Sequence, residues 1–189
     1  MLKSKLGILA FSVIAAAGLV LVVGSTAYGD PDAAEIKKIA EMLKKGDQAS
    51  AKKAAAAYAK KHNDIDDLMT AFKAAKKKGL GVVGTDAGIE QTLTKIGRDA
   101  PPAAVVEKMS KAYEDMGYEI AAVGLITENL YTEKDSGKKT RKAWTEWSAG
   151  MTDAGIKLAE AAKTKSAADI KTQASRVNTN CNSCHSTFR

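Results

Sequence analysis

Proline and strand-forming patterns are both scarce in this chain of 189 residues. Its three prolines are Pro31, Pro101 and Pro102, and the rest of the chain is rich in alanine, lysine, glutamate and leucine-type helix formers. No convincing run of alternating β-branched residues occurs, since Val82-Val83 is too short and is surrounded by glycines. The composition therefore excludes a β-rich domain and predicts an all-α fold.

Cysteine is scarcer still, and both cysteines lie in the last nine residues, within Cys181-Asn182-Ser183-Cys184-His185. Cys-x-x-Cys-His is the attachment signature of a c-type haem. Residues three apart share one face of a helix, so both sulfurs can form thioethers with the vinyl groups of one porphyrin. The imidazole of His185, displaced by about 100° around the helix, can reach the iron as its proximal ligand. We therefore predict one covalently attached haem c.

A redox pair, a zinc site and a chance occurrence each fit the motif less well than a haem does. A redox-active Cys181–Cys184 pair needs no histidine and normally lies near a strand–helix junction. A structural zinc site needs four ligands, and the fourth here would be the distant His62. A chance occurrence is countered by the absence of further cysteines and by the export signal at the other end of the chain.

That export signal occupies residues 1–29. Lys3 and Lys5 precede an apolar run over residues 6–23, and small residues suited to cleavage after Ala27 or Gly29 follow it. We expect a signal peptide and a periplasmic protein, because bacteria attach haem covalently after export. The apolar run is also close to the minimum length of a membrane-spanning helix. An uncleaved leader that tethers the protein to the inner membrane therefore stays open.

Helical periodicity and turn residues divide the rest of the chain. The expected helices cover 32–45, 50–62, 63 to about 79, 89–96, 103 to about 131, 140–162 and 167–188. We predict a hairpin over residues 30–62 and a haem-binding bundle over residues 63–189. Gly79–Gly84 spells G-x-G-x-x-G but lacks a preceding strand, which indicates a loop rather than a dinucleotide site.

Apolar residues recur at steps of three and four along the three long C-terminal helices. The expected stripe of the last helix places both cysteines at core positions: Ile170, Ala174, Val177, Cys181, Cys184 and Phe188. The 103–131 helix has a stripe of its own: Val105, Met109, Ala112, Met116, Ile120 and Val123. Plain core packing is the expected role of Trp144, Trp147 and Met151, as it is of Met109 and Met116.

The segment Cys181-x-x-Cys184-His185-x-x-Phe188-Arg189 resembles the class II c-type cytochromes, which are cytochrome c′ and its low-spin relatives. The resemblance is clear over residues 140–189 and extends to 103–131. It implies an antiparallel four-helix bundle, here with extra N-terminal helices, and a haem near the C-terminus of the last helix. By the same resemblance Cys181 and Cys184 bind the haem, His185 is the proximal ligand, and Arg189 lies near the proximal face or the propionates. A solvated C-terminal arginine is the alternative for Arg189.

The sixth iron position separates two functions. A thioether ligand gives six-coordinate iron suited to electron transfer, whereas an open face binds nitric oxide or carbon monoxide. If the helix from Ile65 is the first of the bundle, its N-terminal turn faces the haem, and Met69 becomes the leading distal candidate. The alternatives are Met42, His62, or no ligand, with Leu68 or Phe72 packed over an open face.

We expect a periplasmic mono-haem electron carrier and no enzyme, because there is one haem motif and no nucleophile–base set. The net charge of +7 comes mostly from scattered lysines, which argues against nucleic-acid binding. The charge would attract an acidic redox partner. Family members often form homodimers through their first two helices, and the extra N-terminal helices leave that state open here.

Overall fold

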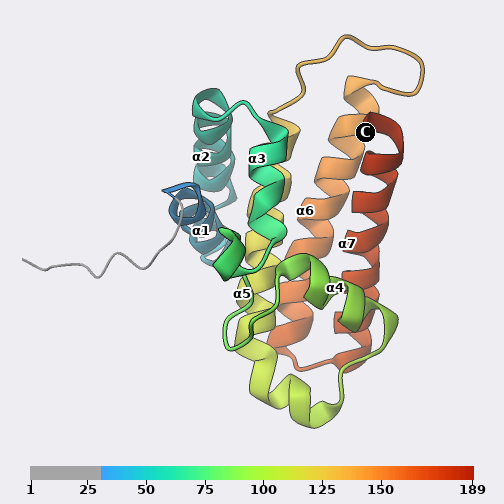
Figure 1. The fold of residues 1–189 in the computed structure, drawn as a ribbon. Coiled ribbons are helices and arrows are strands. Elements are labelled where there is room, and N and C mark those ends of the chain that lie inside the picture. Colours follow the sequence, from blue (N-terminus) through green and yellow to red (C-terminus); the bar gives the residue numbers. More distant parts are fainter. Residues whose placement is uncertain (1–30) are drawn as a thin grey trace, which may run out of the picture.

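The computed structural model describes residues 31–189, which fold into helices only (Figure 1). The predicted leader at 1–29, with its apolar run at 6–23, lies outside the described residues. Between Pro31 and Arg189 the sole β-type pairing is an isolated bridge between Ser136 and Lys139. No helix in this part of the chain is long and apolar enough to cross a membrane. The all-α prediction is confirmed.

The N-terminal hairpin consists of α1 (Pro31–Lys44) and α2 (Gln48–Lys61). Gly46 turns the chain with a φ of +78°, and the Asp47 carboxylate caps α2 by accepting a hydrogen bond of 3.0 Å from the Ser50 amide. Both helices pack against α5 and bury an apolar stripe there: Ile36, Ile39, Leu43, Ala51, Ala55 and Tyr58. The hairpin is therefore part of the folded body.

The helix expected from residue 63 to about 79 is much shorter in the structure. The Asp64 carboxylate caps its start, but α3 (Ile65–Met69) is followed only by two single 3₁₀ turns, η1 (Thr70–Phe72) and η2 (Ala75–Lys77). The chain folds back on itself here, since the amides of Leu80 and Gly81 donate to the carbonyls of Ala71 and Lys73. Tertiary folding thus overrides the local helix propensity.

The helix α4 (Ile89–Arg98) confirms the predicted short helix and lies along α7. Two side chains of α7 bind carbonyls of α4. Ser175 Oγ donates to Gly97 O at 2.7 Å, and Asn178 Nδ2 donates to Leu93 O at 3.1 Å. These hydrogen bonds join α4 to the helix that carries the haem motif.

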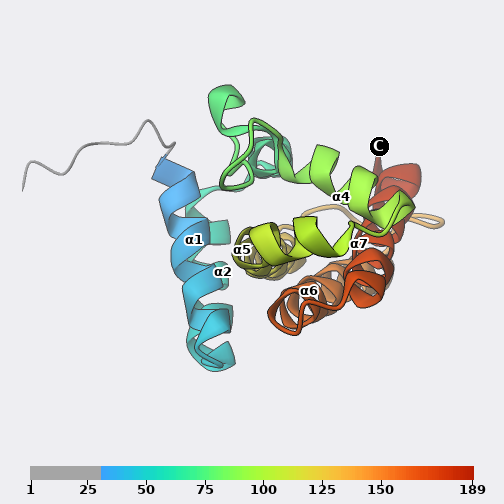
Figure 2. The same cartoon turned by 90° about the horizontal axis from the view of Figure 1, so that it is seen from below.

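Three long helices form the body: α5 (Ala103–Glu128), α6 (Arg141–Lys163) and α7 (Ala167–Phe188). Thr140 and Ser166 cap α6 and α7 through their side-chain oxygens, close to the predicted starts. Figure 2 shows α5 between the hairpin on one side and α6 and α7 on the other. The most extensive helix contact is between α5 and α6.

This central position explains where the predicted stripe of α5 is wrong. Every residue from Met116 to Thr127 is buried, because neighbours cover both sides of the helix. Near the start of α5 the stripe is displaced by one residue, so Val105 is exposed and Val106 is buried. A single-stripe pattern suits a helix with one buried face and does not describe a helix that is enclosed on both sides.

The sequence predicts a four-helix bundle, whereas the structure has three long helices flanked by a broken segment. That segment begins with α3 beside α5 and ends with α4 beside α7 (Figure 1). The fourth position thus consists of two short helices joined by turns rather than of one continuous helix.

Candidate functional site: a cavity at the C-terminal end of α7

A cavity of about 250 Å³ lies at the end of α7, where α3, α5 and α6 also contribute residues. Six residues of α7 and its terminus line it: Asn180, Cys181, Cys184, His185, Phe188 and Arg189. All the haem-binding residues predicted at the C-terminus are therefore brought together at one cavity. Both thiols are free and half-buried, as attachment to a flat group inside a helical body requires.

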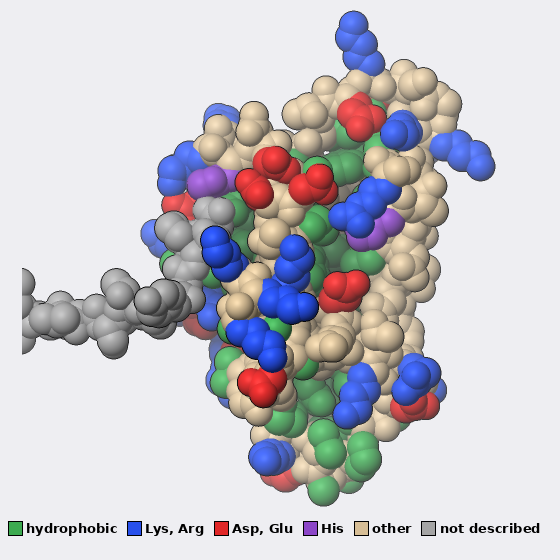
Figure 3. Space-filling view, viewed as in Figure 1, with side chains coloured by type: hydrophobic (Ala, Val, Ile, Leu, Met, Phe, Trp, Pro, Cys, Tyr) green, Lys and Arg blue, Asp and Glu red, His purple; other side chains and the backbone are tan. Residues whose placement is uncertain are grey.

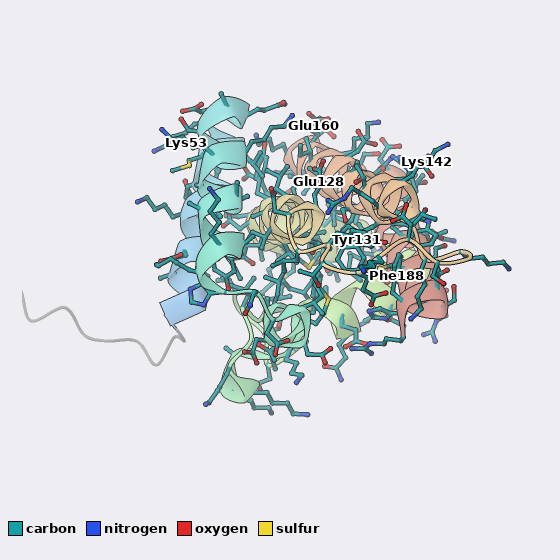
Figure 4. All side chains as sticks on the ribbon, turned by 90° about the horizontal axis from the view of Figure 1, so that it is seen from above. Lys53, Glu128, Tyr131, Lys142, Glu160 and Phe188 are labelled. Atoms are coloured by element: carbon teal, nitrogen blue, oxygen red, sulfur yellow. The ribbon has the colours of Figure 1, made fainter. Side chains whose placement is uncertain are left out.

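The remaining lining is largely apolar and aromatic, which suits a porphyrin face. Figure 4 shows Tyr131 and Phe188 close together at this end of the molecule. The Phe188 ring packs edge-on against three aromatic rings, with centroid distances of 6.1 Å to Tyr131, 5.0 Å to Trp144 and 5.7 Å to Trp147. The donor set and the apolar walls thus fit a covalent haem.

One of these aromatic side chains is also held by a hydrogen bond. Trp144 Nε1 donates to the carbonyl of Thr127 at 2.6 Å in a buried position. This contact fixes the indole of α6 against the C-terminal end of α5. The aromatic wall therefore belongs to the core as well as to the cavity.

Burial also sets the protonation of the haem motif. It raises the pKa of the Cys181 thiol to about 11, and Cys184 and Glu90 act in the same direction. Burial likewise raises the pKa of Cys184. The pKa of His185 is lowered, first by burial and then by the nearby Arg189 cation. A neutral imidazole, the form that binds metals, is thereby favoured at neutral pH.

The short helix α3 brings Ile65, Asp66 and Met69 into the same lining. Met69, the predicted distal candidate, is half-buried there at the last residue of α3. At the edge of the cavity the Arg189 guanidinium lies 3.7 Å from the Asp66 carboxylate. This exposed ion pair joins the end of α7 to the start of α3 and contributes little by itself.

Met151 of α6 lines the cavity too and is almost fully buried. The sequence assigned it to core packing, together with Trp144 and Trp147, which are also in the lining. Helix register could have identified all three. A short connection makes α6 and α7 antiparallel, so residues early in α6 lie level with residues late in α7.

Four other distal candidates are absent from the lining. Met42 lies in α1 against the hairpin core, and the ring of His62 packs on Tyr58 with centroids 4.6 Å apart. Leu68 and Phe72, which were expected over an open iron face, are likewise absent from the cavity lining. Leu68 is buried towards α1 and α2, and Phe72 lines a separate groove beside α4. Ile65 is the aliphatic residue of α3 that enters the cavity.

A zinc site finds no support in the structure, because residues 31–189 contain no group of three or more histidine, cysteine or acidic side chains placed to hold a metal.

The sequence model of the cytochrome c′ family matches residues 103–189, which span α5 to the C-terminus. This part of the chain matches the c′ family of class II c-type cytochromes. No match is found among curated proteins or solved structures.

The family match explains the composition of the cavity. Cytochromes c′ carry covalently attached haem c, and they are generally non-enzymatic and typically periplasmic. The matched range covers both cysteines, His185 and the aromatic wall, and it excludes α3. Met69 therefore lies in a segment that the family match does not cover.

Proposed function

We propose that this protein is a periplasmic mono-haem cytochrome that transfers electrons. In this proposal Cys181 and Cys184 attach the haem, His185 is the proximal ligand and Met69 is the distal ligand. The single observation that carries the proposal is the cavity, which brings these four residues together from α3 and α7.

Haem c supplies the one-electron chemistry, and the chain's own residues set the conditions for it. His185 stays neutral because burial and Arg189 lower its pKa. Phe188, Trp144 and Tyr131 keep water away from one side of the cavity. A thioether from Met69 stabilises the reduced iron and so raises the potential, which suits a carrier.

In this proposal the segment from α3 to α4 occupies the place of the first helix of a four-helix haem bundle. It lies beside α5 at one end and beside α7 at the other. The Asp64 cap fixes the start of α3 and with it the position of Met69, five residues later. The hairpin at 30–62 then belongs to the outer side of α5, and residues 63–189 form the haem-binding unit.

The proposal also includes the redox partners, the attachment to the membrane and the oligomeric state. The redox partners are proteins with acidic faces, and no nucleic acid is involved. A retained leader at 6–23 would tether the protein to the inner membrane. Family members often form homodimers through their first two helices. Less surface is free for such a contact here, because the hairpin covers one side of α5.

The test compares Met69→Leu with Met151→Leu in the haem-loaded protein. Both residues line the cavity, and both changes remove a thioether while nearly conserving volume. We expect the wild type and Met151→Leu to be low-spin and unaffected by carbon monoxide. Met69→Leu should become high-spin and bind carbon monoxide in its ferrous form.

Two results would refute this assignment. A wild-type protein that is already high-spin and binds carbon monoxide would be a gas-binding cytochrome rather than a carrier. A spectrum that changes with Met151→Leu and stays unchanged with Met69→Leu would move the distal ligand from α3 to α6.

A further inference from the structure

A groove of about 1020 Å³ lies outside the haem cavity, between the turns that follow α3 and the outer face of α4. We call it the lysine groove, after the basic side chains that line it: Lys73, Lys76 and Lys77 from the turns, and Lys95 and Arg98 from α4. Two acidic side chains, Asp86 and Glu90, line it as well. Buried Phe72, Ile96 and Tyr113 form an apolar floor.

The positive charge of this groove is concentrated and not neutralised from within. Four of the six residues from Lys73 to Lys78 are lysines, and no acidic residue lies between Asp67 and Asp86. None of the groove's four lysines forms an ion pair with a described residue, whereas Arg98 is bound by Asp99 at 2.7 Å. Figure 3 shows lysine and arginine side chains gathered over the connection between α3 and α4.

The backbone that carries these lysines is held tightly. A Cβ on Gly79 would lie 2.0 Å from the carbonyl oxygen of Lys73, and one on Gly88 would lie 2.6 Å from that of Phe72. The Gly81 amide donates to the Lys73 carbonyl at 3.1 Å. Such close backbone contacts hold the backbone that carries the three lysines of the turns in a fixed arrangement, so a ligand would have to order only their side chains.

The groove also adjoins the haem cavity through α4. Glu90 and Lys95 of the groove's wall belong to α4, which is bonded to α7 through Asn178 Nδ2 and the Leu93 carbonyl at 3.1 Å. Lys73 follows directly after η1, only four residues from Met69 in the cavity. A partner seated in the groove would therefore lie near the haem edge, where electron transfer is fastest.

We propose that the lysine groove is the docking surface for an acidic segment of a redox partner protein. This inference rests on the proposed electron-transfer function and adds the place and chemistry of the contact. Carboxylates of the partner would meet the lysines on both walls. An apolar residue among those carboxylates would cover Phe72 and Tyr113 on the floor.

The experiment measures binding of a fluorescent decaglutamate peptide to the oxidised, haem-loaded protein by fluorescence anisotropy. The test variant is Lys73→Gln/Lys76→Gln/Lys77→Gln. The control, Lys52→Gln/Lys53→Gln/Lys60→Gln, removes the same charge from exposed lysines of α2 that have no ion pair with a described residue. Lys53 lies on the other side of the molecule from the end of α7 (Figure 4). Circular dichroism confirms that each variant is folded.

Exposed charge pairs contribute modestly, so losing three of them should weaken binding about tenfold. The control should bind within about twofold of the wild type, because none of its three lysines lines the groove. Lys95→Gln, on the opposite wall, should weaken binding by a smaller factor. Raising the salt concentration should reduce wild-type affinity more than that of the groove variant.

Equal losses in the groove variant and the α2 control would overturn the proposal, since net charge alone would then explain binding. No binding by the wild type would overturn it too. Stronger groove-dependent binding to phosphatidylglycerol vesicles than to the peptide would replace the protein partner by a membrane surface. Peptide binding does not depend on iron coordination, so a high-spin spectrum would refute the proposed function and leave this test intact.

Discussion

The contact between α5 and α6 depends on glycines, and replacing Gly155 by alanine should weaken it. A Cβ on Gly155 would lie 2.8 Å from both the Ala121 nitrogen and the Gly117 oxygen. Both are backbone atoms, so neither can rotate away. Ordinary van der Waals contact begins at 3.4 Å, which means that the two helices must separate by about 0.6 Å.

That separation loosens the best-packed interface of the molecule. Overpacking of this kind costs about 1–3 kcal/mol, and the higher helix propensity of alanine returns about 1 kcal/mol. From the middle of the overpacking range we expect a net loss of about 1 kcal/mol, which lowers the melting temperature by roughly 2–4 °C for a chain of this size. Thermal and denaturant unfolding of the haem-loaded protein, followed by circular dichroism, would measure it.

The matched control is Gly150→Ala in the same helix. Its Cβ would lie 2.7 Å from Asn180 Oδ1, but that atom ends a flexible side chain and can move. We expect Gly150→Ala to be as stable as the wild type or more stable by up to about 1 kcal/mol. A Gly155→Ala protein as stable as the wild type, or equal losses in both variants, would refute the packing argument.

Two further predictions concern the carboxylates of Glu119 and Asp64. Burial raises the pKa of Glu119 from 4.5 to about 7, against a smaller opposing effect of Lys37. The folded protein then holds a proton that the unfolded chain has lost, so stability falls as the pH rises between these two values, by about 3 kcal/mol in all. Glu119→Gln should abolish this fall, and a pH series of urea unfolding curves in which both proteins decline equally would contradict the idea. Asp64→Ala removes the cap of α3 and should cost about 1 kcal/mol. If α3 supplies the distal ligand, absorption spectra should show more high-spin iron in this variant. An unchanged spin state would indicate that Met69 is not an iron ligand.

Sequence patterns anticipated the parts of this fold that depend on local chemistry. The starts of α6 and α7 lie within a residue of the predicted ones, and the Cys-x-x-Cys-His motif requires particular residue types at particular spacings. The boundaries of the long helices were therefore predictable to within a few residues. The resemblance to class II cytochromes, drawn from the haem motif, agrees with the family match over residues 103–189.

The errors arose where tertiary contacts outweigh local preference. The segment after Met69 has helix-forming residues, yet it turns back at Lys73 because Gly79 and Gly81 pack against that residue. Val105 was assigned to the core by periodicity, but in the first turn of α5 the tertiary contacts bury Val106 instead and leave Val105 exposed. The packing role predicted for Met151 is confirmed, because the residue is buried in the core. Its second position, in the lining of the cavity, follows from the pairing of α6 with α7, which the sequence pattern of α6 alone does not contain.

The most direct test of the central claim is the intact mass of the exported protein, produced in cells that attach haem covalently. We predict the mass of the mature chain plus one haem, with the haem retained after acid extraction. Replacing Cys181 and Cys184 together by serine should leave the mass of the bare chain. A wild-type protein with the bare-chain mass, or one that releases its haem on extraction, would contradict the claim that these two sulfurs hold the haem at the end of α7.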